Sequence, residues 1–180
     1  MIRQAPNAAP PELTVVTAPH LELVGVPEPA TVSSDNFLTA TEHALITDTS
    51  FGKSSKQLVR RFGDRRSIRE RYDTLQDRFG VLTVAAVVHQ VIERGLIEVG
   101  AQEDSELVEN LSRTNLFAIR CLARGITERE IAPKLGRPEA DVYTSFNRAV
   151  TDVGARSRPH AVRQGHIHGI LSPRKPASPR

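Results

Sequence analysis

The sequence contains one pattern of apolar residues and glycines twice, in residues 38–63, LTATEHALITDTSFGKSSKQLVRRFG, and in residues 111–136, LSRTNLFAIRCLARGITEREIAPKLG. They align without a gap at an offset of 73 residues, which matches Leu38, Thr41, Ile46, Gly52 and Gly63 with Leu111, Thr114, Ile119, Gly125 and Gly136. At an offset of 74, the match continues from Gly80, Val88, Gln90 and Gly95 to Gly154, Val162, Gln164 and Gly169. Because chance seldom keeps glycines in register, we interpret the pattern as an internal duplication.

Each copy is expected to form four short helices. Capping boxes, in which a hydroxyl and a side chain three residues later satisfy each other's backbone N–H, are predicted at Thr39 with Glu42, Ser54 with Gln57, and Thr127 with Glu130. The third helices are predicted over about 66–79 and 138–153, and the fourth over about 83–94 and 157–168. Pro133 falls inside a second helix and is expected to weaken or bend it. The predicted fold is all-α, with two tandem four-helix modules.

The distribution of charge and proline suggests where the modules begin and end. We expect a disordered proline-rich arm over residues 1–37, modules over 38–97 and 111–171, an acidic linker over 98–110, and a basic tail over 172–180. The arm carries a formal charge of −3, the first module +3, the linker −5, the second module +5 and the tail +3. The whole chain of 180 residues has a net charge of +3. Two basic blocks joined by an acidic strip are typical of two binding modules and a solvated connector.

Several classes of protein are not expected from this sequence. The single cysteine, Cys121, excludes an internal disulfide framework, and its place on an apolar stripe predicts a small core residue. No Ser/His/Asp constellation or pair of catalytic acids is found, so the chain is not predicted to be an enzyme, and no cofactor is expected. His166 and His168 point to different helix faces, which predicts surface histidines and no metal site. No apolar run approaches the length of a membrane span, so a cytoplasmic protein is expected.

Two helices joined by a glycine-containing turn, the second with a polar face, outline a helix-turn-helix. In the second copy, the strings LSRTN, GITEREIAPKLGRPEADV and GARSRPHAV resemble the LuxR/GerE-type DNA-binding domain. In the first copy, GKSSKQLVRRFG and GVLTVAAVVHQVIERGLI fit the same frame. The resemblance implies a sequence-specific bacterial transcription regulator that binds double-stranded DNA. Residues 1–37 do not suit a receiver or a ligand-binding domain, so control by either is not expected.

The resemblance also implies which residues contact DNA, because the third helix of this family enters the major groove. The groove-facing positions are Arg65, Arg66, Arg69 and Arg71 in the first copy, and Asp141, Tyr143, Thr144, Asn147 and Arg148 in the second. Basic positions near phosphate are Lys56 and Arg129 on the second helices, and Arg156 and Arg158 at the entry to the last helix. Arginine suits both roles, since it binds phosphate oxygens and reads guanine through two hydrogen bonds.

The fourth helix of the first copy, within LTVAAVVHQVI, is more apolar than a small module needs. We therefore expect Val84, Val87, Val88 and Val91 to form an interface, either in a homodimer or with another regulator or RNA polymerase. The rival hypothesis is a protein-interaction module that keeps the helix-turn-helix fold and modulates such a partner without reading DNA.

Overall fold

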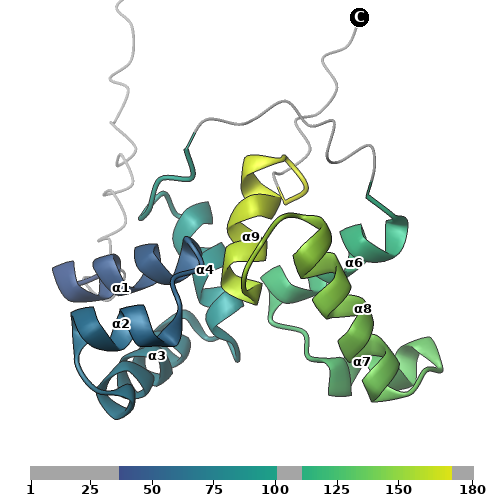
Figure 1. Cartoon of the computed structure of the whole chain (residues 1–180), viewed down its shortest axis with the longest axis horizontal. Helices are drawn as coiled ribbons and strands as arrows, with labels where there is room; N and C mark the ends of the chain where they lie inside the picture. Colours follow the sequence, from purple (N-terminus) through teal and green to yellow (C-terminus); the bar gives the residue numbers. More distant parts are fainter. Residues whose placement is uncertain (1–36, 101–110, 172–180) are drawn as a thin grey trace, which may run out of the picture. The chain divides into compact units, whose positions relative to one another are not determined.

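The computed structural model of the chain describes residues 37–100 and 111–171, which form eight α-helices and no β-strand. The first four helices, repeat one, are α1 (Ala40–Ser50), α2 (Ser55–Phe62), α3 (Arg65–Phe79) and α4 (Val84–Glu93). The other four, repeat two, are α6 (Arg113–Arg124), α7 (Glu128–Leu135), α8 (Glu139–Asp152) and α9 (Arg158–Ile167) (Figure 1). The all-α prediction is confirmed. The arm over 1–36, the greater part of the acidic linker and the basic tail lie outside the described residues.

The helix ends follow the local sequence. All three predicted capping boxes are present, at Thr39 with Glu42, Ser54 with Gln57, and Thr127 with Glu130. Gly136 takes the left-handed conformation that ends α7, with φ of 60°. Helix α7 continues through Pro133 as far as Leu135, with the proline side chain exposed.

One hydrophobic core serves both repeats. Helix α4 packs against α9 and α6 of repeat two, and α9 also packs against α1 of repeat one. The first helix of each repeat therefore contacts the fourth helix of the other. The main cluster of buried side chains runs through both repeats, and its members include Leu75, Val88, Ile119, Phe146 and Val162. The two repeats share this core instead of each burying its own.

A smaller cluster lies at the helix-turn-helix of repeat one. It consists of Leu45, Leu58 and Ile68, one each from α1, α2 and α3, with Phe62 and Tyr72 packed against it. The hydroxyls of Tyr72 and Thr49 lie 2.6 Å apart and tie α3 to α1. Helix α3 also reaches the main core, through Leu75 and Phe79, as α7 and α8 do in repeat two. Helix α2 contributes its apolar side chains to the smaller cluster and none to the main core.

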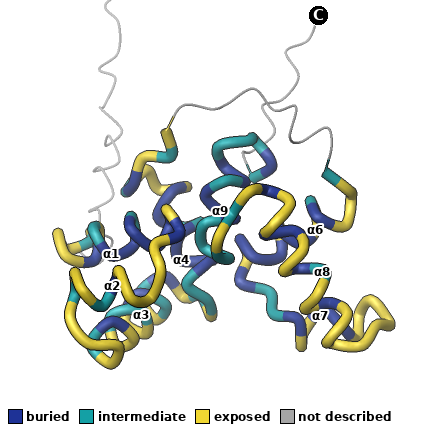
Figure 2. Tube along the Cα trace, viewed as in Figure 1, coloured by how far each residue is buried: buried dark blue, intermediate teal, exposed yellow. Residues whose placement is uncertain are grey.

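Polar contacts also join the repeats. The Arg163 guanidinium of α9 donates to the Val99 carbonyl at 2.7 Å and to the Ser50 hydroxyl at 3.4 Å. Arg163 is buried, as is the greater part of α4, whereas exposed residues gather on α2, on α3 and at the turn after α7 (Figure 2). Within the described ranges, no helix combines the length and hydropathy that a membrane span needs.

Candidate nucleic-acid interface

Two helix-turn-helix pairs occupy matching places in the two repeats. Helix α2 packs against α3, and α7 packs against α8. Gly63 follows α2 with φ of 102°, in the region that favours glycine, so the chain turns within two residues into α3. Gly136 has the same role before α8. The second helix of each pair, α3 or α8, keeps one face free of the core, and these two faces are the candidate DNA contacts.

The exposed face of α3 is rich in arginine. Arg66 and Arg69 expose 89% and 84% of their side chains, and Arg65 is also exposed, whereas Arg71 is half-buried. Arg66 pairs with Glu70 at 2.9 Å, and Arg69 lies 3.9 Å from Asp73. Exposed pairs four residues apart on a helix contribute only about 0.3–0.5 kcal/mol, so these arginines can exchange their carboxylates for phosphates at little cost.

A hollow between α2 and α3 gathers two of the predicted residues. Arg65 and Arg69 line it together with Ser55 and Tyr72, over a floor of Leu58 and Ile68, and its volume is about 280 Å³. Lys56 is exposed on the adjoining helix α2. The structure therefore brings Arg65 and Arg69 together beside α2, whereas Arg66 and Arg71 do not line this hollow.

An aspartate closes the beginning of α3. The Asp64 carboxylate accepts hydrogen bonds from the backbone N–H groups of Arg66 at 2.7 Å and Ser67 at 3.0 Å. The hydrogen bonds from Ser67 and then Arg66 lower the pKa of Asp64, which stays ionised at neutral pH. This charge occupies the helix end where a phosphate would otherwise bind. Phosphate contacts by α3 must therefore come from its arginine side chains.

The exposed face of α8 has a different chemistry. Asp141, Tyr143, Thr144, Asn147 and Arg148 are all exposed, as the sequence analysis requires. Arg148 lies 3.6 Å from Asp152, and the Thr144 hydroxyl donates to the Ala140 carbonyl within the helix. Helix α8 has one arginine against three acids, whereas α3 has five arginines against three acids. The formal charge is therefore −2 on α8 and +2 on α3.

The predicted phosphate contacts of repeat two are only partly free. Arg158 forms an ion pair with Glu128 at the start of α7, and its guanidinium lies over the Tyr143 ring, 5.4 Å from the centroid. Arg129 and Arg156 are exposed. Arg158 therefore acts within the chain, bracing α9 against α7 and α8. Sequence analysis missed this partner because Glu128 is 30 residues away.

Sequence analysis also missed an exposed cation in the turn. Arg137 stands between α7 and α8, next to Lys134 in the last turn of α7, and both are exposed. The string KLGRP could have predicted both, because a glycine that ends a helix and a proline that follows it indicate an exposed turn, and Lys134 and Arg137 flank that glycine. These two side chains offset part of the acidic charge at the start of α8.

The four valines predicted to form an interface lie on α4. Val87, Val88 and Val91 are fully buried and Val84 is half-buried. Helices α6 and α9 pack against α4, so the surplus of valines faces the other repeat of the same chain. These three buried valines are not exposed for another molecule. Helices α6 and α9 of the same chain supply the covering surface that we expected from a partner.

Two further expectations can be compared with the structure. Cys121 is buried, as predicted for a small core residue, and burial raises the pKa of its thiol. The prediction of a surface histidine is wrong for His166, which is 8% exposed and lies against α4. The helical pattern of its own segment did not show this, because the covering side chains come from the other repeat.

No family model, curated protein or solved structure matches the chain.

Proposed function

We propose that the chain is a sequence-specific DNA-binding transcription regulator of LuxR-like type, without a catalytic role. The observation that carries the proposal is the exposed arginine face of α3, which is the second helix of a helix-turn-helix pair. Arginines on an exposed helix of this kind suit both phosphate oxygens and the guanine edge in the major groove. The resemblance of the sequence to the LuxR/GerE-type domain supports the same function in a bacterial cytoplasm.

The charge difference between helices α3 and α8 indicates how the two repeats divide the work of binding DNA. Helix α3 has a net charge of +2 and α8 of −2. Since DNA binding depends on neutralising phosphates, repeat one supplies the stronger contacts in this proposal. Repeat two, with Arg148, Asn147 and Tyr143 exposed, adds weaker contacts or orients repeat one through the common core.

The test is selection of duplexes from a randomised pool by the full chain, followed by titration of the selected duplex. Arg65→Ala and Arg69→Ala are each expected to weaken binding about tenfold, because a specific arginine contact is worth about 1–3 kcal/mol. Each lost phosphate contact also reduces the slope of log K against log salt by about 0.9. The matched control is Arg120→Ala, an exposed arginine on α6 outside both helix pairs. Failure to select any sequence, or equal affinity for all three variants, would contradict the proposal.

A second candidate function rests on repeat two. Glu139 and Asp141 begin α8, and Tyr143 exposes half of its surface beside them. An acidic face with an exposed aromatic suits a basic protein surface better than DNA. A protein that modulates another regulator or RNA polymerase through this face would bind it without a duplex. Loss of a stoichiometric protein complex in Tyr143→Ala, with DNA affinity absent in the wild type, would favour this function.

A further inference from the structure

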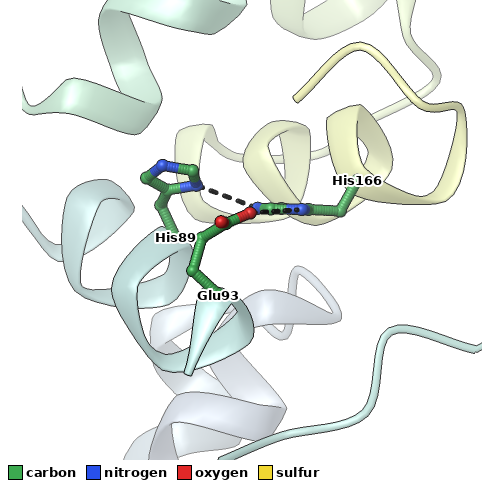
Figure 3. A group of neighbouring side chains, drawn as sticks. All are labelled: His89, Glu93 and His166. Carbon is green, nitrogen blue, oxygen red and sulfur yellow. Dashed lines mark hydrogen bonds and ion pairs between the residues drawn. The ribbon is translucent and has the colours of Figure 1, made fainter. Parts of the chain in front are cut away.

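A cluster of three possible metal ligands lies where the fourth helices of the two repeats meet. His89 and Glu93 are four residues apart on α4 and share one face of that helix, and His166 reaches them from α9 (Figure 3). His89 Nδ1 and His166 Nε2 are 2.9 Å apart, and His166 Nδ1 is 3.6 Å from Glu93 Oε1. One ligand atom from each residue falls within 4.8 Å of the other two.

We propose that His89, Glu93 and His166 bind one divalent transition-metal ion, of which zinc is the best fit, and that this ion joins the two repeats. Two imidazoles and a carboxylate form a donor set that zinc accepts with a fourth position left for water. Imidazole also distinguishes such an ion from magnesium and calcium, which prefer oxygen ligands.

The geometry needs two adjustments to hold the ion, one of the two rings and one of the Glu93 side chain. With metal–nitrogen distances of about 2.0–2.1 Å, two ligand nitrogens of a tetrahedral site lie about 3.3 Å apart. The two imidazoles must therefore separate by about 0.4 Å from their present hydrogen-bonded distance. Glu93 lies near His166 Nδ1, whereas His89 faces His166 Nε2, so the Glu93 carboxylate must swing toward the Nε2 side to share an ion with both rings. Its side chain is 38% exposed and has room to do so. Only the His166 ring is held firmly, since 5% of its side chain is exposed.

The protonation state of the cluster suits metal binding. Burial, and then the neighbouring His89, lower the pKa of His166 to about 4, and burial also lowers the pKa of His89. Both rings are therefore neutral at pH 7 and keep a lone pair for an ion. Two nearby charges act on the pKa of His89 in opposite directions: the Glu93 carboxylate raises it and the Arg124 guanidinium lowers it. The carboxylate belongs to the proposed ligand set, and its negative charge opposes the repulsion between Arg124 and a bound cation.

A metal ion at this position would stabilise the fold, because its ligands come from both repeats. Helices α4 and α9 belong to different repeats and pack against each other, and a bound ion would cross-link them at residues 77 positions apart. An ion that binds only the folded chain raises stability by mass action. The proposal does not depend on DNA binding, and its test needs no duplex.

The experiment uses the full chain, freed of metal by a chelator and then titrated with zinc chloride in a calorimeter, with the melting temperature followed in parallel. We expect one site per chain, a higher Tm with zinc, and the visible absorption of tetrahedral Co²⁺ when cobalt replaces zinc. Glu93→Gln and His89→Gln are each expected to weaken zinc binding at least tenfold. Glu93 is exposed, so its variant keeps the test valid should the histidine variant fold poorly.

The matched control is His43→Gln, at an exposed histidine on α1, which is expected to leave zinc affinity unchanged. Absence of a zinc-dependent change in Tm together with absence of cobalt absorption in the wild type would overturn the proposal. Binding that survives Glu93→Gln and His89→Gln, or that disappears in His43→Gln, would overturn it as well.

Discussion

The guanidinium of Arg163 lies over the ring of Phe51, with its central carbon 3.9 Å from the ring centroid. Arg163 belongs to α9 of repeat two, and Phe51 is the residue that ends α1 of repeat one. The same arginine donates to the Ser50 hydroxyl of α1 and to the Val99 carbonyl, which follows repeat one at the start of the predicted linker. A buried cation of the second repeat is therefore held by groups of the first repeat and of the segment directly after it, at the contact between α1 and α9.

The cation–π contact predicts that Phe51→Leu lowers the free energy of unfolding by about 1–2 kcal/mol. Such contacts are worth about 0.5–1 kcal/mol when exposed and about 2 when desolvated, and here the arginine is buried and the ring half-exposed. Urea denaturation followed by circular dichroism measures the loss. Phe117→Leu is the matched control, since its ring is 40% exposed on α6 without a cation over it in the described part of the chain. Equal losses in the two variants would show that the cation adds nothing.

The ion pair between Glu42 and Arg78 predicts a larger loss. Both guanidinium nitrogens of Arg78 reach the Glu42 carboxylate, at 3.1 and 2.9 Å, and Glu42 is 6% exposed. Glu42→Gln keeps an acceptor for the Thr39 N–H but leaves Arg78 without its anion. Breaking a buried pair costs about 3–5 kcal/mol, and because Arg78 is partly exposed we expect about 1–3 kcal/mol. Glu70→Gln, which breaks the exposed pair with Arg66, should cost less than about 0.5 kcal/mol.

The same carboxylate makes this loss depend on pH. Burial raises the pKa of Glu42, but hydrogen bonds from Arg78 and Thr39 lower it by more, so the net pKa lies below its usual value. A carboxyl with a lowered pKa stabilises the fold above its unfolded pKa, and this contribution disappears as the pH falls through the folded value. The difference in stability between wild type and Glu42→Gln should therefore shrink below about pH 4. A constant difference down to pH 3 would contradict this account.

Much of the secondary structure could be predicted from residues close together in the chain. The capping boxes at Thr39, Ser54 and Thr127 are interactions across three residues, so the sequence shows them directly. The turn at Gly136 is equally local. The effect of Pro133 was harder to predict, because α7 extends only two residues beyond it and its side chain is exposed.

The contacts between the repeats could not be predicted in this way. A helical pattern shows that Val87, Val88 and Val91 share an apolar character, but not which surface covers them. His166 likewise meets His89 only because α9 packs on α4, far away in sequence. The groove-facing residues of α3 and α8 stay predictions, since exposure makes contact with DNA possible without demonstrating it.

Histidine ionisation predicts that the fold weakens below neutral pH. His160 Nδ1 accepts a hydrogen bond from the Arg156 N–H at 3.1 Å, which only the unprotonated nitrogen can do. Burial, followed by the charges of Arg156 and Arg163, lowers the pKa of His160. The unfolded chain therefore binds a proton that the folded chain resists, so stability is full above about pH 6.5 and declines as the pH falls below it.

Urea denaturation at a series of pH values between 8 and 5 measures this slope. His160→Gln should make it shallower, because glutamine cannot take up the proton, although His89 and His166 contribute in the same direction. The matched control is His43→Gln, whose exposed side chain makes none of these hydrogen bonds. A slope that is unchanged in His160→Gln would contradict the assignment.

The close approach of α9 to α6 predicts an unusual result for Gly165→Ala. In an exposed helix, replacing an interior glycine with alanine stabilises by about 1 kcal/mol. Here an added Cβ would lie 2.9 Å from both Ile119 Cγ2 and Leu171 Cδ1. The Leu171 side chain can move aside, but Ile119 is fully buried in the core, and overpacking a core costs about 1–3 kcal/mol. We therefore expect a net loss of stability of about 1 kcal/mol.

Comparison with repeat one explains why the glycine is needed only once. At the offset of 74 residues, the position of Gly165 corresponds to Val91 on α4, which is fully buried. A Cβ at Gly165 would meet Ile119 of α6 and Leu171 after α9, whereas the Val91 side chain is accommodated in the core. Thr151→Ala on the exposed face of α8 reports the gain from helix propensity, less the hydrogen bond that the Thr151 hydroxyl donates to the Asn147 carbonyl. If Gly165→Ala stabilised the fold as much as Thr151→Ala, α9 would not be packed tightly on α6, and the common core would be looser than the structure shows.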